Sequence, residues 1–190
     1  MKIDMRDVFF ERLVESAKLD KRIVFLSADH GAFALKEFEE KMPDQYINVG
    51  ISEQNMVGLA AGLAASGKIV FAYGISPFVS LRVMEQLTLD VAAMHLPVNI
   101  VSVGAGFTYS TDGPTHHGLQ DLAAVLTIPN LTVLNSSDPI NSRAFIDLAL
   151  TSEKPHYIRI EKEKLHSLPR ADNEQEGFLN GFSVLKNGDK

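Results

Sequence analysis

The 190-residue sequence predicts an α/β protein with a single three-layer domain, in which helices cover both faces of a mostly parallel sheet. Two observations support this prediction. Short apolar runs recur along the chain without the polar alternation of a half-exposed strand, which is typical of strands buried on both faces. Segments with apolar residues at helical spacing separate these runs, so that strands and helices alternate.

The elements are predicted in order from this alternation. Residues 6–19 carry apolar side chains at helical spacing and predict the first helix. Pro43 interrupts a charged link at 32–45, which we expect to be irregular or briefly helical. The predicted strands are 23–26, 46–51, 69–73, 98–103, 131–134 and 157–160. The further predicted helices are 53–66, 77–94, 119–126 and 138–150.

The starts of two helices are marked by proline. Pro77 and Pro139 suit first helical positions, where the missing N–H has no intrahelical partner to lose, and Asp138 precedes Pro139 as a cap. Beyond residue 161 the chain is charged and less patterned, and we expect at most one further extended segment there, at 177–185.

Polar side chains gather where the predicted strands end. Asp29 follows the first strand, Glu53 the second and Ser76 the third, and residues 112–117 lie in the long loop after the fourth. Because the carboxyl ends of parallel strands meet at one rim of an open sheet, we expect these side chains to converge on one crevice.

Glu53 stands at the start of a helix rich in small residues, after an apolar run that ends at Gly50. A half-buried carboxylate in such a place has a raised proton affinity and can hold or share a proton near neutral pH. The alternative is a structural role, because Glu in a first helical turn is favoured by the helix dipole.

Composition argues against several classes of function. The net charge of −6 disfavours a dedicated nucleic-acid binder, which would usually show a basic stripe. No run approaches the roughly 18 apolar residues of a membrane span, and residues 1–6 are too charged for a signal peptide. The chain has no Cys, which permits a reducing compartment. We therefore expect a cytoplasmic protein that binds neither nucleic acid nor membrane.

Two motifs carry a resemblance to a known family. The segment GISEQNM at 50–56 resembles the Gly-Ile-x-Glu-x segment in the pyrimidine-binding domain of transketolase-like, thiamine diphosphate-dependent enzymes. The segment DGPTHHG at 112–118 resembles the Asp-Gly-Pro-Thr-His motif of transketolases, which has a close relative in deoxyxylulose-phosphate synthases. The resemblance implies a pyrimidine-binding domain at 1–165 and a tail at 166–190, which would lead toward a C-terminal domain that this chain lacks.

The resemblance implies cofactor-binding roles for four residues. At the position of Glu53, the family's glutamate hydrogen-bonds the pyrimidine nitrogen opposite the amino group, and so favours the tautomer that accepts the thiazolium proton. Phe78 matches an aromatic ring that stacks on the pyrimidine, Ile75 flanks it, and Asp29 matches a turn near the cofactor. The alternatives are an ordinary core aromatic for Phe78 and a plain strand-end turn for Asp29.

The resemblance implies substrate-binding roles for three further residues. His116 matches a histidine that faces the substrate's hydroxyl or carbonyl oxygen, which makes it a catalytic candidate beside Glu53, and Asp112 matches a substrate-facing acid. Arg6 matches an arginine that holds the sugar phosphate, but a cation at a helix start is the alternative reading. For Asp112 and His116 the alternative is a solvated loop. A metal site built from these two residues and His117 is disfavoured by their spacing, so we expect no metal ligands in this chain.

The phosphate-binding positions depart from the family pattern. Phe33 and Gly104 stand where transketolases have a phosphate-contacting serine and a histidine. The arginine expected after the last strand has no clear match, since Arg159 comes slightly early and Lys162 is only a possible substitute. These changes put the usual phosphorylated ketose donor in doubt.

The resemblance also implies partners, because the family's Gly-Asp-Gly and Asn-Asn motifs for diphosphate and Mg²⁺ have no counterpart here. We expect thiamine diphosphate to be shared with a partner chain or domain that also holds Mg²⁺, homo-oligomers of two or more copies, and a sugar or sugar-phosphate substrate. The expected reaction is transfer of a two-carbon ketol unit, and we expect the isolated domain to be inactive.

Other functions stay open at this point. A deoxyxylulose-phosphate synthase or the beta subunit of a 2-oxo acid dehydrogenase uses the same cofactor, although the loop at 112–118 disfavours the dehydrogenase. A non-catalytic α/β binding domain is the further alternative. A dinucleotide site is disfavoured because residues 104–106 lack the third glycine of the Gly-x-Gly-x-x-Gly fingerprint.

Overall fold

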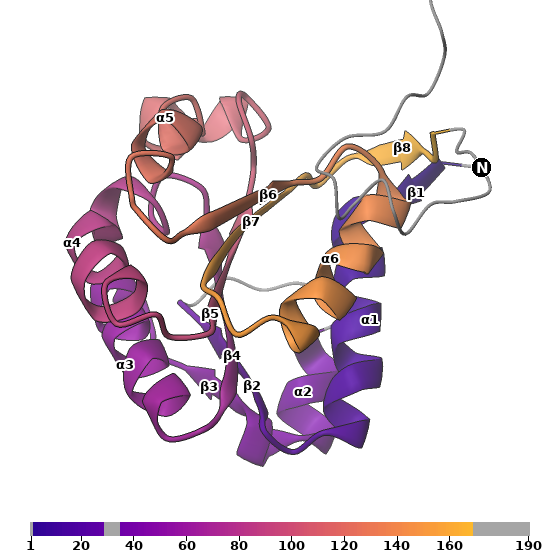
Figure 1. Ribbon diagram of the computed structural model, residues 1–190. Helices are drawn as coiled ribbons and strands as arrows, with labels where there is room; N and C mark the ends of the chain where they lie inside the picture. The colour runs from indigo at the N-terminus through magenta and orange to yellow at the C-terminus, as the bar shows by residue number, and fades with distance from the viewer. Residues whose placement is uncertain (1, 29–34, 169–190) are drawn as a thin grey trace, which may run out of the picture.

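The computed structural model of the protein describes residues 2–28 and 35–168. A six-stranded sheet lies between two layers of helices (Figure 1), which confirms the predicted fold class. Asp29 and the extended segment predicted at 177–185 lie outside the described residues. In the described part, every helix falls short of the length and apolarity that a bilayer crossing needs.

The sheet is parallel throughout and has the strand order β3-β2-β4-β5-β7-β6. Its strands are β2 (Ile23–Ser27), β3 (Tyr46–Asn48), β4 (Ile69–Ile75), β5 (Val98–Val103), β6 (Thr132–Asn135) and β7 (His156–Ile160). The chain leaves β2 for β3 on one side and then returns past β2 to β4 on the other. The carboxyl ends of β2 and β4 therefore flank a topological switch point, where open α/β sheets bind their ligands.

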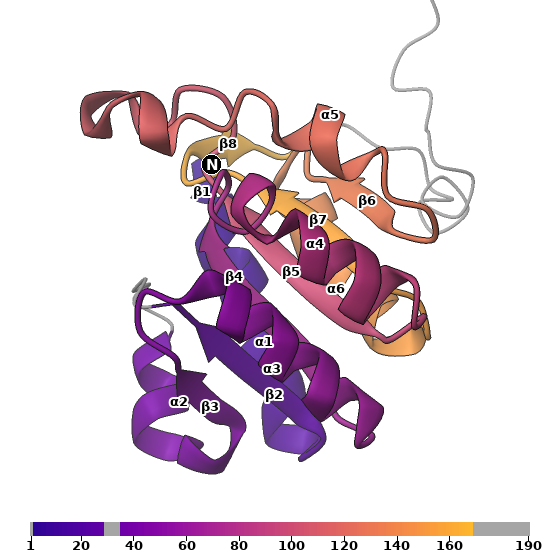
Figure 2. The same ribbon diagram turned by 90° about the vertical axis from the view of Figure 1, so that its left-hand side faces the viewer.

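The helices form one layer on each face of the sheet. One layer contains α1 (Met5–Leu19), α2 (Leu35–Lys41) and α6 (Pro139–Thr151). The other contains α3 (Glu53–Ala65), α4 (Met84–Gln86) with the π-helical turn η3 (Leu87–Ala92), and α5 (Asp121–Val125). Figure 2 views the molecule from the side of this second layer, with α3 and α4 in front of the sheet.

Successive side chains of β4 point to opposite faces of the sheet and therefore belong to two different cores. Phe71 and Tyr73 belong to the core beneath α1 and α6, where the ring of Phe10 meets that of Tyr73 edge to face at 4.9 Å. Val70 and Ala72 belong to the other core, which lies beneath the small residues of α3. A strand buried on both faces is apolar at every position, which explains the unbroken apolar runs of the sequence.

Two short strands form a separate antiparallel ribbon that the sequence did not predict. β1 (Lys2–Asp4) pairs with β8 (Lys164–His166), so that the start of the chain lies against a segment more than 160 residues away. Asp4 ends β1 and also caps α1, since its carboxylate accepts hydrogen bonds from the backbone N–H groups of Arg6 and Asp7 at 3.0 and 3.2 Å.

Two predicted elements were too long, for local reasons. The strand predicted at 46–51 ends at Asn48, whose side-chain oxygen accepts from the N–H of Gly50, and Gly50 has φ +72°. The helix predicted at 77–94 starts late, because residues 76–80 form a turn in which the Ser80 hydroxyl donates to the Ser76 carbonyl at 2.6 Å. A 3₁₀ turn, η2 (Leu81–Val83), then precedes α4.

Candidate functional site

The carboxyl edge of the sheet brings together three segments that carry candidate residues. Glu53 begins α3 after β3, Phe78 lies in the turn after β4, and the loop at 104–118 follows β5. Within that loop, Asp112 and His116 lie in two short 3₁₀ turns, η4 (Ser110–Asp112) and η5 (Pro114–His116). The three segments meet beside the carboxyl end of β4, one of the two strands that flank the switch point.

Glu53 is a buried carboxylate that has one charged partner among residues 2–28 and 35–168. Only 4% of the residue is exposed, and its Oε2 accepts a hydrogen bond from Arg82 Nη1 at 2.7 Å. Arg82 comes from η2, and the Gln54 side chain donates to its backbone carbonyl at 3.0 Å. The first turn of α3 therefore holds the segment that supplies the cation for Glu53.

The same arginine continues the contacts from Glu53 toward the loop. Its guanidinium carbon lies 4.1 Å from the centre of the Phe78 ring. The Phe78 ring also contacts the His116 ring, with 5.0 Å between the ring centroids and an interplanar angle of 75°. His116 Nδ1 in turn lies 3.0 Å from the Thr115 hydroxyl oxygen. Glu53, Phe78 and His116, which stem from three different segments, thus belong to one continuous group.

Arg6 and Asp112 lie in a second group, around the phenol of Tyr109. Burial raises the pKa of Tyr109, Arg6 opposes that rise, and Asp112 and Glu161 add to it. The Arg6 side chain is 14% exposed and pairs with Asp7 at 3.6 Å, while its Nε is buried without a hydrogen-bond partner among the described residues. The two substrate-binding candidates thus act on one ring.

Glu161 and Lys162 complete this second group where β7 ends. The Lys162 ammonium lies 5.5 Å from the centre of the Tyr109 ring. Burial raises the pKa of Glu161, although a hydrogen bond from the Thr108 hydroxyl offsets part of that rise. This region therefore combines cations with a half-buried carboxyl group.

Four other residues were singled out from the sequence. Ile75 packs against the core beneath α1 and α6, and its backbone carbonyl accepts a hydrogen bond from the Phe78 N–H at 2.9 Å. Asp29 and Phe33 lie outside the described residues. His117 is half-buried, and its ring contacts that of Phe107 at 5.0 Å. Across residues 2–28 and 35–168, no group of three or more Asp, Glu or His side chains is arranged to hold a metal ion.

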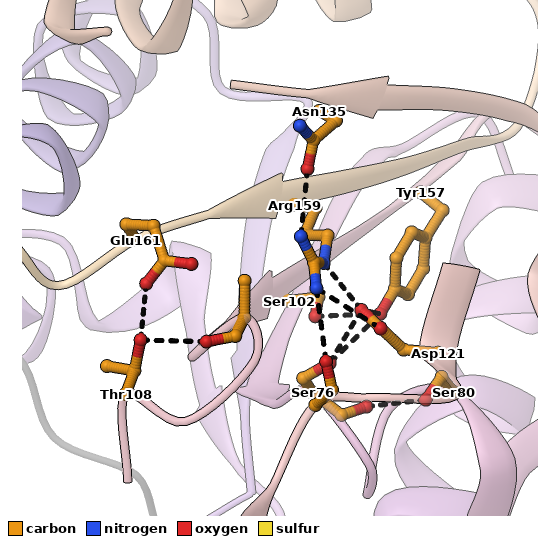
Figure 3. Close-up of polar contacts among 11 residues, drawn as sticks. Ser76, Ser80, Ser102, Thr108, Asp121, Asn135, Tyr157, Arg159 and Glu161 are labelled. Atoms are coloured by element: carbon orange, nitrogen blue, oxygen red, sulfur yellow. Dashed lines mark hydrogen bonds and ion pairs between the residues drawn. The ribbon is translucent and has the colours of Figure 1, made fainter. Parts of the chain in front are cut away.

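Asp121 is the centre of a buried polar network that sequence reasoning missed (Figure 3). This carboxylate, 1% exposed, accepts hydrogen bonds from Arg159 Nε at 2.7 Å, from the Ser76 hydroxyl at 2.8 Å and from the Tyr157 hydroxyl at 3.2 Å. Arg159 Nη2 adds a second bond to the carboxylate at 3.3 Å. Burial, followed by the charge of Asp121, raises the pKa of Tyr157.

The network joins the two segments that carry Phe78 and His116. Ser76 precedes the Phe78 turn, and Arg159 Nη2 donates to the backbone carbonyl of Gly118 at 3.1 Å, at the base of the loop. A Cβ atom at Gly118 would lie only 2.6 Å from the Gly104 carbonyl oxygen, so the close approach requires glycine. Arg159 is thus a structural ion-pair partner of Asp121.

The first group has the chemistry to bind a flat nitrogen heterocycle. The Glu53 carboxylate accepts hydrogen bonds, and the Phe78 ring offers a surface for stacking. The planar, delocalised Arg82 guanidinium already makes both kinds of contact, which shows that a planar donor fits between them. The second group, with its cations and carboxyl groups, has the polarity to bind a hydroxylated or anionic molecule.

Comparisons with known proteins identify the family of the chain. The family model described as transketolase, pyrimidine binding domain, matches residues 1–167. The 6-deoxy-6-sulfo-D-fructose transketolase subunit SqwH of Clostridium sp. (strain MSTE9) is 39% identical over 97% of this chain, which covers 57% of that relative. A 1-deoxy-D-xylulose-5-phosphate synthase of Dechloromonas aromatica (strain RCB) is 36% identical over 88% of this chain and is covered to 28%.

A solved structure described as a split gene transketolase, inactive beta4 tetramer, is also similar. It superposes with a TM-score of 0.79 at 31% identity, over 90% of this chain and 56% of its own. The chain thus spans little more than half the length of this structure and of the Clostridium relative.

Proposed function

Since the chain belongs to the family of transketolase pyrimidine-binding domains, we propose that it forms the pyrimidine-binding part of a transketolase that transfers a two-carbon ketol unit between sugars or sugar phosphates. One observation supports this most directly. The buried carboxylate of Glu53, the Phe78 ring and the His116 loop form one connected group at the carboxyl edge of the sheet.

The residues present fit thiamine diphosphate. A buried carboxylate beside an aromatic ring provides the hydrogen-bond acceptor and the stacking surface that an aminopyrimidine needs. When bound, thiamine diphosphate supplies the carbanion chemistry of ketol transfer, and the protein supplies binding and orientation. In this proposal Glu53 accepts a hydrogen bond from the pyrimidine nitrogen when that nitrogen carries a proton, and Phe78 orients the ring.

The loop residues would act on the substrate. His116 can donate a hydrogen bond to a carbonyl or hydroxyl oxygen, or accept one from a hydroxyl group. Its ring is held by Thr115 and Phe78, so it is oriented before a ligand arrives. Arg6 and Asp112, in the group around Tyr109, would contact the polar end of the sugar.

A partner is part of the proposal. The relatives that this chain resembles are longer than it, and two of them are described as a subunit and as a split gene product. We infer that a diphosphate-binding chain or domain completes the site, holds Mg²⁺ and shares the cofactor. Assembly into dimers or larger homo-oligomers would bring the two parts together.

A second candidate is a synthase that uses the same cofactor to make a deoxyketose phosphate. The similarity to a 1-deoxy-D-xylulose-5-phosphate synthase favours it, although this chain covers only 28% of that enzyme. The two functions differ in the donor substrate. An assay of the assembled enzyme with a ketose donor and, separately, with pyruvate distinguishes them by the product.

The proposed function is tested by Glu53→Gln in the chain assembled with a diphosphate-binding partner, thiamine diphosphate and Mg²⁺. We expect kcat for ketol transfer to fall by at least about 100-fold, because an amide cannot replace a carboxylate in proton exchange with the pyrimidine. Glu15→Gln is the matched control, since Glu15 is an exposed ion-pair partner of Arg143. Ketol transfer at the wild-type rate in Glu53→Gln would refute the proposal.

A further inference from the structure

Arg82 makes the two contacts that the proposed function assigns to the cofactor ring. Its Nη1 donates to Glu53 Oε2 at 2.7 Å, and its guanidinium lies 4.1 Å from the centre of the Phe78 ring. A guanidinium is planar and delocalised, donates to carboxylates and stacks on aromatic rings. An aminopyrimidine is likewise planar, donates to a carboxylate and stacks.

From this geometry we propose that Arg82 is an internal competitor for the pyrimidine ring, which must leave Glu53 and the Phe78 face before the ring can bind. This inference rests on the proposed function. It adds that affinity for the cofactor is set by the release of Arg82 as well as by the groups that hold the ring.

Arg82 can leave without disrupting the fold. Its side chain is 43% exposed, whereas that of Glu53 is 5% exposed, so the arginine reaches water by rotating its flexible stem. The Gln54 side chain holds the Arg82 backbone carbonyl, so the backbone can stay in place while the guanidinium moves. A guanidinium that moves into water regains its hydration, which offsets part of the lost contact with Glu53.

Glu53 cannot be left without a partner in the same way. A carboxylate buried to this extent is costly when it is unpaired. Exchange of Arg82 for a pyrimidine whose ring nitrogen carries a proton replaces one donor to Glu53 by another. The arginine therefore pairs with the carboxylate in the free chain. It also lowers the apparent affinity of the site for a ligand, because only molecules in which Arg82 has left Glu53 can bind one.

The test is a titration of the full 190-residue chain with 4-amino-5-hydroxymethyl-2-methylpyrimidine, followed by NMR shifts so that millimolar affinities are measurable. Arg82→Met keeps an apolar stem and removes the guanidinium. We expect it to bind the probe about tenfold more tightly than wild type, because the competing state is lost. Arg82→Gln serves as a second variant and should shift in the same direction.

Two further variants make the result specific. Arg143→Met is the matched control, because Arg143 is 44% exposed and pairs with Glu15 at 2.8 Å, away from the site residues. Its affinity for the probe should equal that of wild type. Glu53→Gln should bind the probe at least about tenfold more weakly, since a charge-assisted hydrogen bond is lost.

The outcomes separate this inference from the function on which it rests. If Glu53→Gln binds weakly and neither Arg82 variant binds more tightly than wild type, the competition by Arg82 is refuted and the pyrimidine site stands. If Glu53→Gln binds as well as wild type, or no variant binds the probe, both the inference and the proposed pyrimidine site are refuted.

Discussion

At the scale of single residues, Arg82 and Arg159 show that one residue type serves two purposes near the site. Arg159 is held at several points, by Asp121, Asn135 and the Gly118 carbonyl, and its side chain is 15% exposed. Arg82 makes one ion pair and is 43% exposed. The first is a fixed structural element, whereas the second is free to exchange its partner for a ligand.

His156 shows how burial sets the charge of a side chain away from the site. The Asn99 amide nitrogen donates to the Val70 carbonyl, so its oxygen faces His156 and accepts from Nδ1–H at 2.8 Å. Burial, helped by the nearby Lys154, lowers the pKa of His156 to about 4. The imidazole is therefore neutral in the folded protein at pH 5, where an unfolded histidine is charged.

This histidine predicts a pH dependence of stability. Between pH 4 and about 6.5 the unfolded chain binds a proton that the folded chain does not, so stability should fall as the pH drops through this window and stay constant above it. The loss from this group should approach about 3 kcal/mol at pH 4. Urea unfolding from pH 4 to 8 measures it.

Two variants isolate the contribution of His156 to that profile. His156→Gln should remove its part of the fall in stability below pH 6.5, whereas His95→Gln, at an exposed position, should keep the wild-type profile. Identical profiles for His156→Gln and wild type would show that another group is responsible.

At the scale of elements, the Asp121 network predicts a large effect of one substitution. Asp121→Ala leaves the Arg159 guanidinium half-buried without its carboxylate and removes the acceptor of Ser76 and Tyr157. We expect the free energy of unfolding to fall by about 3 kcal/mol or more. Chemical denaturation measures this loss.

The control for Asp121 is an ion pair on the surface. Asp147 pairs with Arg12 at side-chain exposures of 52% and 29%, so Asp147→Ala should cost less than about 1 kcal/mol. Equal losses for the two variants would mean that the buried network does not fix the loop to the sheet.

The long, locally consistent elements of the fold were predictable from the sequence. The first helix and the strands at 69–73 and 98–103 are continuous apolar or periodic segments, and the structure has them within a few residues of the predicted bounds. The ribbon of β1 and β8 was not predictable, because each strand has three residues and exists only through pairing with the other.

The candidate site was predictable only in part. Glu53, Phe78 and His116 were found from two motifs, and the structure places them in one group. Arg82 was overlooked although it lies four residues after Phe78, a spacing that can bring two side chains together. Asp121 and Arg159 are 38 residues apart, so no local pattern indicates their pairing.

At the scale of the whole molecule, the ribbon of β1 and β8 predicts that a disulfide can link these two strands. Ile3 lies opposite Leu165, and the chain has no Cys of its own that could form a competing disulfide. The double variant Ile3→Cys with Leu165→Cys should form a disulfide that stabilises the protein by about 2–4 kcal/mol, because it closes a very long loop.

The measurement is the thermal midpoint with and without reducing agent. The oxidised double variant should melt higher than the same protein after reduction, and the single variant Ile3→Cys should show no such difference. Equal midpoints for the oxidised and reduced double variant would contradict the pairing of the two strands.

The β1–β8 pairing also bears on how such a domain can be reused. Because Lys2 and His166 are register partners, the described part of the domain begins and ends close to a single spot. Recombination could therefore move this unit as a cassette between host proteins, since the flanking sequences would need to meet only that one spot and not opposite poles of the structure.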